Sequence, residues 1–320
     1  MRINNKCFGV DLGGTTTKIG LFNMDGTLIE KYEVPTNKKD DGIHILDDIK
    51  VFIDQVIVEK SLDSNDIIGI GLGVPGAVTD DGIVNKCINL GWNVINVESI
   101  MKEKTNFNVK VGNDANMAAL GEYWKGGAAE FSSIALITIG TGIGGGIIMN
   151  GRPINGYNGA AGEIGHVSIV YDETETCNCG KKGCLEQVAS ASGIVRVAKK
   201  FLNATDTDSS LRGLEDISAK SVFDEAKKGD AVASEVVAYI TKYLGLALAN
   251  IAGVIDPECF VIGGGVSAAG QYLVDLIAAS YRKNVFHPCK DTPIVLASLG
   301  NDAGMYGAAK LVIDASKNEQ

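Results

Sequence analysis

Residues 11–18 read DLGGTTTK, which places two glycines and three threonines directly behind an apolar segment. Residues 8–12 supply that segment, and a second, mostly apolar segment at 18–22 follows, so this part of the chain is predicted to be a β-hairpin that continues into a third strand at 27–34. Because glycine carries no side chain, successive backbone N–H groups of such a turn can face phosphate oxygens. The candidate phosphate ligands here are Asp11, Gly13, Gly14, Thr15, Thr16 and Lys18.

This turn matches neither of the two common nucleotide-binding patterns. It is not G-x-G-x-x-G or a Walker A sequence, and the pattern predicts no helix behind it, which disfavours both the dinucleotide-binding fold and the P-loop fold. Taken alone, a Gly-Gly-Thr stretch is also compatible with an ordinary hairpin turn.

A related pattern recurs in the middle of the chain. An apolar strand at 134–139 precedes the stretch GTGIG at 140–144, and a second strand is expected at 145–149. Gly140 follows Gly13 by 127 residues, a domain's length, which suggests a duplicated fold with a nucleotide held between the copies. Two unrelated hairpins are the alternative. A third glycine run at 263–265 also follows an apolar strand and suits an adenosine.

Strands alternate with helices over much of the remaining sequence. A helix at 43–60, a strand at 67–72 and a turn at 73–76 lead to a helix at 97–104 and a strand at 108–111. Such alternation predicts an α/β architecture. Beyond residue 190 the chain is predicted to be mostly helical, with strands at 259–262 and near 293 and a final helix ending near 313.

The composition is that of a globular protein with unusually many glycines. Of 320 residues 40 are glycine, and the net charge is −10, so there is no overall attraction to nucleic acid or to an anionic membrane. The polar N-terminus fits no secretory signal, which predicts a cytoplasmic location. The apolar stretch at 236–255 has a helical period and polar interruptions, so we expect a core helix there and no membrane span.

Asp114 stands where a predicted strand ends and a helix begins. An aspartate at this position can cap the helix by accepting hydrogen bonds from the first amides. It can also serve as a general base, because open α/β sheets bind their ligands at the carboxyl ends of the strands. The two roles do not exclude each other.

Three of the seven cysteines are clustered as C-x-C-x₄-C at Cys177, Cys179 and Cys184, a pattern typical of metal binding in a cytoplasmic protein. His166 is the nearest of the three histidines and completes a candidate Cys₃His set for structural zinc, with reduced, unliganded thiols as the alternative. The other cysteines are predicted to be buried thiols: Cys7, Cys87, Cys259 and Cys289.

Two carboxylates flank the cysteine cluster, Glu163 on one side and Glu186 on the other. A zinc ion that fixes His166 would also fix its neighbours, giving a rigid set of acceptors for a polyhydroxylated ligand. Two solvated surface charges are the simpler alternative.

Together these motifs resemble the ROK family (repressors, open reading frame products and sugar kinases), and within it the bacterial ATP-dependent glucokinases. The most specific element is CNCGKKGCLE at 177–186, which matches the family signature C-x-C-G-x-x-G-C-x-E at every fixed position. The stretches at 11–16, 73–77, 113–122 and 162–166 accompany it, so the resemblance covers nearly the whole chain.

The resemblance implies the duplicated actin-like ATPase (ribonuclease H-like) fold, with two lobes and the active site in the cleft between them. Residues 1–114 and about 302–320 would form the small α/β lobe. Residues from 115 to about 301 would form the large lobe, which carries the zinc loop at 166–186. A homodimer or a dimer of dimers is also implied.

The implied reaction is the phosphorylation of the 6-hydroxyl of glucose by ATP with Mg²⁺, with Asp114 as the base. The residues implied to bind the sugar are Asn89, Asn113, Asp114, Glu163, His166 and Glu186. His166 would bind zinc through one ring nitrogen and the sugar through the other. The residues implied to hold the phosphates of ATP include Thr138, Gly140, Thr141, Gly142 and Gly144, and those for adenosine are Gly263, Gly264, Gly265 and Val266.

Two alternatives remain within this family. One is a kinase for another hexose: N-acetylmannosamine, N-acetylglucosamine, fructose or allose. The other is a sugar-sensing regulator without catalysis, which in this family carries a DNA-binding segment ahead of the kinase-like body. Since the first strand is expected at about residue 8, we expect an enzyme that binds neither nucleic acid nor a membrane.

Overall fold

The computed structural model describes residues 5–318 and divides the chain into two compact units. The first unit comprises Met1–Ser132, Gly146–Gly162 and Asn301–Gln320. The second comprises Ser133–Gly145 and Glu163–Gly300. This division differs from the lobes expected from the sequence, because the helix that follows Asp114 belongs to the first unit.

The first unit is built on a five-stranded sheet in the order β3-β2-β1-β4-β7. Strands β1, β2 and β3 form an antiparallel meander, whereas β4 and β7 extend the sheet in parallel from β1. The meander expected around the first glycine turn is therefore confirmed. The strand bounds are β1 Lys6–Leu12, β2 Thr16–Asn23, β3 Leu28–Pro35, β4 Ile67–Val74 and β7 Val109–Asn113.

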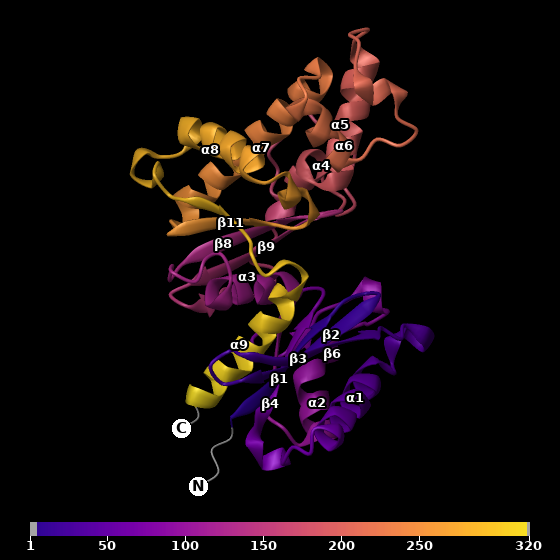
Figure 1. Ribbon diagram of the computed structural model, residues 1–320, viewed down its shortest axis with the longest axis vertical. Helices are drawn as coiled ribbons and strands as arrows, with labels where there is room; N and C mark the ends of the chain where they lie inside the picture. Colours follow the sequence, from indigo (N-terminus) through magenta and orange to yellow (C-terminus); the bar gives the residue numbers. More distant parts are fainter. Residues whose placement is uncertain (1–4, 319–320) are drawn as a thin grey trace. The chain divides into compact units, whose positions relative to one another are not determined.

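Helices cover both faces of this sheet (Figure 1). Helices α1 (Ile45–Glu59) and α2 (Val97–Thr105) pack on one face, and α9 (Ala303–Asn318) lies on the other. The approach of α9 is close, since a Cβ atom at Gly71 of β4 would lie 1.8 Å from the carbonyl oxygen of Ala308. Glycine at this position is what allows the helix backbone to touch the sheet.

Helix α3 (Asp114–Lys125) packs against α9 at two further glycines. A Cβ atom at Gly121 would lie 2.1 Å from the carbonyl oxygen of Ala303, and one at Gly307 would lie 1.8 Å from that of Met117. Because the two backbones approach so closely, α3 is joined to the first unit. A short two-stranded sheet of β5 (Ile83–Val84) and β6 (Ile95–Asn96) completes the unit.

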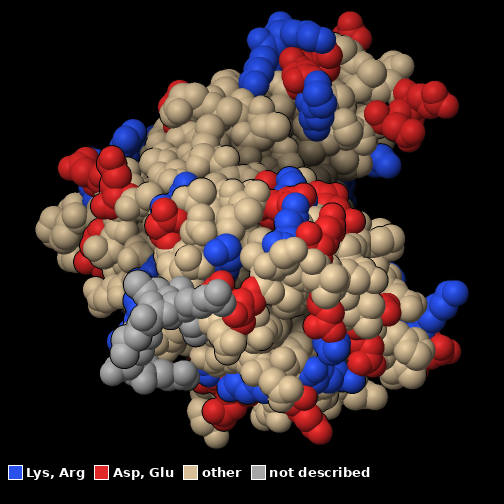
Figure 2. Space-filling view, turned by 60° about the horizontal axis from the view of Figure 1, so that its bottom comes forward, with Lys and Arg blue, Asp and Glu red and all other residues tan. Residues whose placement is uncertain are grey.

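On the face that Figure 2 shows, charged side chains of both signs are present, and the basic ones form no continuous patch. Several are paired within the first unit, for example Lys31 with Asp302 at 3.1 Å and Lys104 with Asp47 at 2.5 Å.

The second sheet repeats the topology of the first, in the order β10-β9-β8-β11-β12, and the division between the units falls within β9. β9 pairs antiparallel with β10 as β2 does with β3, and β11 pairs in parallel with β8 and β12 as β4 does with β1 and β7. The strand bounds are β8 Ile134–Ile139, β9 Ile143–Met149, β10 Arg152–Pro153, β11 Cys259–Gly263 and β12 Ile294–Leu296.

The two glycine turns also correspond in length. β1 ends at Leu12 and β2 begins at Thr16, while β8 ends at Ile139 and β9 begins at Ile143, so each pair of positions is 127 residues apart. The duplication inferred from the sequence is therefore confirmed, and the alternative of two unrelated hairpins is wrong.

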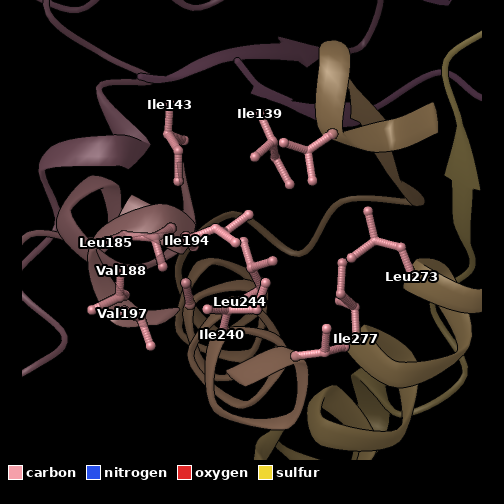
Figure 3. Packing of buried hydrophobic residues seen from close by; sticks show 14 of the residues in the cluster. Ile139, Ile143, Leu185, Val188, Ile194, Val197, Ile240, Leu244, Leu273 and Ile277 are labelled. Carbon is pink, nitrogen blue, oxygen red and sulfur yellow. The ribbon is translucent and has the colours of Figure 1, made fainter. Parts of the chain in front are cut away.

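Five helices enclose the core of the second unit: α4 (Leu185–Ala189), α5 (Ala191–Ala204), α6 (Ala219–Lys227), α7 (Ala231–Ile255) and α8 (Gln271–Asn284). Helix α7 is long and apolar enough to span a membrane by length and composition. Its Ile240 and Leu244 nonetheless lie fully buried among side chains of α4, α5 and α8 (Figure 3). This is the core helix expected from the sequence.

Candidate functional site

The first glycine turn is closed by hydrogen bonds within the turn and with β3. The N–H of Gly13 donates to the carbonyl oxygen of Thr16 at 3.1 Å, and the N–H of Thr36 donates to that of Thr15 at 2.9 Å. A Cβ atom at Gly13 would lie 2.6 Å from the Thr16 oxygen, so this tight turn requires glycine. The ammonium group of Lys18, a predicted phosphate ligand, donates to the carbonyl oxygen of Asn301 at 2.5 Å. Both residues belong to the first unit.

Asp11 ends β1 beside this turn, with its carboxylate against the start of α9. A Cβ atom at Gly304 would lie 2.6 Å from the carboxyl carbon of Asp11, so glycine leaves the room for this group. Burial raises the pKa of Asp11 to about 6, and the charges of Asp114 and Asp302 add to the rise while Lys18 opposes it. Asp11 and Asp114 therefore lie within electrostatic range of each other.

The cap of α3 is Asn113, and the expectation that Asp114 caps this helix is wrong. The Asn113 Oδ1 atom accepts from the N–H of Asn116 at 3.1 Å. Asp114 is instead the first helical residue, and its Oδ1 atom accepts from the N–H of Ala115 at 2.8 Å and from the Asn113 side-chain amide at 3.0 Å. That amide also donates to the carbonyl oxygen of Gly76 at 2.9 Å. Asp114 is thus held in place beside its cap.

Asn89 lies in a short 3₁₀ helix, Ile88–Leu90, close to the glycine turn. Its Cβ atom is 4.0 Å from the place where a Cβ atom of Gly14 would stand. Burial raises the pKa of the Cys87 thiol, and the charge of Asp114 adds to the rise, so this segment also faces Asp114. The first unit therefore gathers Asp11, Asn89 and Asp114 around one turn.

In the second unit, the two other predicted glycine runs lie side by side. Thr138 of β8 is in register with Gly263 of β11. The next residue, Gly264, has φ +80°, and a Cβ atom there would lie 2.6 Å from backbone atoms of Ile139. The N–H of Gly140 donates to the carbonyl oxygen of Gly142 at 2.9 Å, which closes the β8–β9 turn.

A cavity of about 530 Å³ opens between these two runs, with Gly140 and Thr141 on one side and Gly265 and Val266 on the other. Helix α6, which the sequence analysis did not single out, forms a further wall. Its lining residues, with the preceding cap, are Ser218, Ala219, Lys220, Phe223, Asp224 and Lys227. The capping pattern at Ser218 marks where this helix begins, but no local signal tells where it packs.

Gly142 and Gly144 do not line this cavity. A Cβ atom at Gly142 would lie 2.4 Å from Oε2 of Glu186, and that oxygen accepts from the N–H of Ile143 at 2.9 Å. Glu186 is therefore half-buried and held by the turn rather than solvated. Glu163 remains exposed, at the start of the 3₁₀ helix Ile164–His166.

The four candidate zinc ligands lie together. One donor atom from each of His166, Cys177, Cys179 and Cys184 falls within a group whose members are all less than 4.8 Å apart. Sγ of Cys179 is 3.5 Å from Sγ of Cys184, and Sγ of Cys177 is 3.8 Å from Nδ1 of His166. A tetrahedral zinc ion with bonds near 2.3 Å separates its sulfur ligands by about 3.8 Å, so these residues fit zinc.

Short strand bridges shape the loop that carries these cysteines. Ser168 pairs with Cys184, and Thr176 pairs with Lys182. Gly183 has φ +75°, and a Cβ atom there would lie 2.2 Å from the carbonyl oxygen of Val170, so the fold of the loop requires glycine at this point. The remaining four cysteines are buried free thiols, as expected: Cys7, Cys87, Cys259 and Cys289.

The structure thus combines a duplicated α/β sheet, glycine turns at the strand ends and a Cys₃His loop. This combination is typical of one family of sugar kinases and related proteins. The chain belongs to the ROK family, whose sequence profile matches residues 7–315. The expected α/β fold, the duplicated actin-like ATPase architecture, is confirmed with it.

Several relatives match the chain over nearly its whole length. A glucokinase from Halalkalibacterium halodurans is 43% identical over 313 residues, covering 95% of this chain and 94% of that protein. The structure of a ROK hexokinase from Thermus thermophilus is 29% identical with a TM-score of 0.82, covering 98% of this chain and 100% of that one. A ROK family glucokinase from Streptomyces griseus, in complex with glucose and AMPPNP, is 32% identical with a TM-score of 0.74 and coverages of 96% and 98%.

Proposed function

We propose that the protein transfers the γ-phosphoryl group of ATP to the 6-hydroxyl of glucose. The observation that carries the proposal is the match to a glucokinase at 43% identity over 95% of the chain. The structure supports it, because four of the predicted nucleotide residues line a cavity, Gly140, Thr141, Gly265 and Val266, and because Asp114 is held beside a glycine turn.

In the proposed mechanism Asp114 is the general base. Its Oδ1 atom is fixed by two N–H donors, from Ala115 and Asn113, which sets the plane of the carboxylate. The carboxylate takes the proton of the 6-hydroxyl as that oxygen bonds to the γ-phosphorus and the bond to the β-phosphate oxygen breaks, releasing ADP. Phosphoryl transfer depends mainly on such positioning and on neutralising charge.

The other site residues would bind the two substrates. Asn89, Asn113, Glu163, His166 and Glu186 are proposed to hydrogen-bond the remaining sugar hydroxyls. The glycine turn at residues 13–16 and the turn at 140–144 are proposed to hold phosphates. The cavity lined by Gly265, Val266 and α6 suits the adenosine, since nucleoside pockets combine apolar walls with a few polar groups.

Two metal ions belong to the proposal. Mg²⁺ bound with ATP would neutralise phosphate charge, and Asp11, beside the first turn, offers it a carboxylate. Zinc held by His166 and the three cysteines would have a structural role, because four protein ligands leave no open position. Nδ1 of His166 faces Cys177, so the other ring nitrogen, Nε2, is proposed to bind the sugar. A cytoplasmic homodimer or homotetramer is also proposed.

A coupled ADP-release assay across hexoses and N-acetylhexosamines tests the function. We expect the highest kcat/KM with glucose, and we expect Asp114→Asn to lower kcat by about 10²–10⁴ while the fold is kept. Asn at this position can still accept the hydrogen bond from Ala115. A higher kcat/KM for another sugar would overturn the assignment of glucose, no turnover with any sugar would overturn the kinase, and near-normal turnover in the variant would exclude Asp114 as the base.

A further inference from the structure

A line of hydrogen bonds, all within the first unit, leads to the start of α3 from the β10 hairpin, which here means β9, β10 and the loop that follows them to residue 159. The Asn155 side-chain amide donates to Oδ1 of Asp80 at 2.8 Å, and Oδ1 of Asn155 accepts from the Asn116 amide at 3.0 Å. The backbone N–H of Asn116 donates to Oδ1 of Asn113 at 3.1 Å, and the Asn113 amide donates to Asp114 at 3.0 Å. Four contacts thus lead from Asp80 to the proposed base.

Asn116 is the unusual member of this line. Its side chain is 1% exposed and lies in the first turn of α3 next to the fully buried Met117. A buried amide costs free energy unless it is hydrogen-bonded. Within residues 5–318 its Oδ1 atom has no hydrogen-bond partner, so the bond to Asn155 is the one polar contact of this side chain. Neither core packing nor helix propensity accounts for an asparagine here.

The hairpin approaches α3 closely because of a glycine in β9. A Cβ atom at Gly146 would lie 2.6 Å from the carbonyl oxygen of Ala115 and 2.6 Å from Cβ of Ala119. The far side of the hairpin is anchored as well, since the Asn85 amide donates to the carbonyl oxygen of Asn158 at 3.3 Å. Asn155 is therefore presented to Asn116 by a segment fixed on both sides.

We propose that Asn155 and Asn116 are positioning residues for the base: through them, the β10 hairpin fixes the first turn of α3 and with it the Asn113 cap and the Asp114 carboxylate. Neither residue needs to touch a substrate. The proposal rests on the assignment of Asp114 as the base, and it adds that the orientation of this carboxylate depends on a hairpin some forty residues further along the chain.

The test compares Asn155→Ala with a double variant in which the side chains of residues 80 and 155 are exchanged. Asn155→Ala removes the acceptor for Asn116, and we expect kcat to fall by about tenfold while KM for ATP stays within about twofold. The double variant Asp80→Asn/Asn155→Asp keeps an acceptor for the Asn116 amide and reverses the direction of the bond between the two exchanged side chains. We expect it to recover kcat to within about threefold of the wild type. Asn158→Ala, on the same hairpin, is the matched control and should leave kcat unchanged.

A second readout does not depend on activity. The N–H groups of Ala115 and Asn116 are protected by side-chain acceptors at the start of α3, so Asn155→Ala should speed amide hydrogen exchange in a peptide covering residues 113–118. The double variant should restore slow exchange there, and Asn158→Ala should not alter it.

The outcomes separate this inference from the proposed function. A wild type that phosphorylates no sugar overturns the function, while the exchange comparison still tests the positioning. Unchanged kcat and unchanged exchange in Asn155→Ala overturn the positioning role. A lower Tm with normal kcat in Asn155→Ala would also overturn it, because the contact would then be purely structural. A double variant whose kcat is as low as that of Asn155→Ala would do the same, because restoring the acceptor for Asn116 would then not restore turnover.

Discussion

At the scale of single residues, Asp11 combines a cost to stability with a place at the first glycine turn. Burial raises its pKa from an ordinary 3.8 to about 6. Between pH 3.8 and about 6 the folded state holds this proton more tightly than the unfolded chain does. The free energy of unfolding therefore falls as pH rises through this range. At neutral pH a pKa shift of this size corresponds to a destabilisation on the order of 3 kcal/mol.

We therefore expect Asp11→Asn to raise Tm at about pH 7.5, and we expect the gain to shrink as pH is lowered through about 6 toward about 3, where Asp11 is protonated in both states. Turnover with ATP should fall, because the carboxylate beside the glycine turn is lost. Thermal unfolding at several pH values measures the effect. Asp25→Asn is the control, since hydrogen bonds from Thr27 lower the pKa of Asp25 and no gain is expected there. An equal gain at every pH would show that ionisation is not the cause.

The sequence identified the residues at the start of α3 better than their roles. Asn and Asp are about equally good helix caps, so adjacent residues of these two types cannot be ordered from the pattern. The structure gives the cap to Asn113, and the carboxylate of Asp114 accepts hydrogen bonds from Ala115 and from the Asn113 amide. The function of Asn116 was beyond the reach of the sequence, because its partner Asn155 is distant along the chain.

At the scale of elements, the cysteine loop has no helix or strand of its own between Cys177 and Cys184. Its strand bridges are isolated pairs, and Cys179 is exposed, so the loop buries little apolar surface at that point. The proposed zinc ion would add to the stability of the loop, since metal binding to such ligands becomes local folding energy.

We expect about one zinc per chain in the purified protein. Cys179→Ser should lose the zinc and lower Tm by at least about 5 °C. Because Cys179 is exposed, lost packing cannot account for a fall of that size. Elemental analysis and thermal unfolding measure both effects, and Lys182→Ala in the same loop is the control. Carefully prepared wild-type protein without zinc would disprove the site.

The cavity beside α6 can be filled without disturbing the fold. A Cβ atom at Gly265 would meet no atom within 4 Å, and this residue lines the cavity. We expect Gly265→Leu to raise KM for ATP by about tenfold or more while KM for the sugar stays within about twofold. Gly253 of α7 is equally open and does not line the cavity, so Gly253→Leu is the matched control. Unchanged KM for ATP would place the adenosine elsewhere.

Elements were predicted well where their pattern is local. The hairpins around both glycine turns, with their shared spacing of 127 residues, follow from apolar runs and turn residues. Helix α6 was recognised only as part of a helical region, because the cavity that it lines is formed with β-strand ends far away in sequence. Local periodicity identifies a helix, and tertiary packing decides what it faces.

At the scale of the whole molecule, the two compact units follow helix packing and not the order of the chain. The expected lobes followed the chain at Asp114, whereas α3 and residues 146–162 belong to the first unit. Contacts at Gly121 and Gly307 join α3 to α9, which lies nearly two hundred residues further along. A boundary set by such close helix packing leaves no signal in composition or charge near the boundary itself.

The charge of the whole molecule leads to a last prediction, on the salt dependence of ATP use. The net charge is −10, and on the face in Figure 2 basic side chains lie among acidic ones, so the overall charge of the molecule does not attract ATP from a distance. The proposed phosphate sites consist of turns whose backbone N–H groups act only at short range. We therefore expect kcat/KM for ATP, at constant excess Mg²⁺, to fall by less than about threefold between about 50 and 300 mM NaCl. Initial rates over this range measure it, with an uncharged osmolyte as the control for viscosity. A tenfold fall would show that exposed lysines or arginines contribute to ATP binding, and the backbone turns would then be only part of the phosphate site.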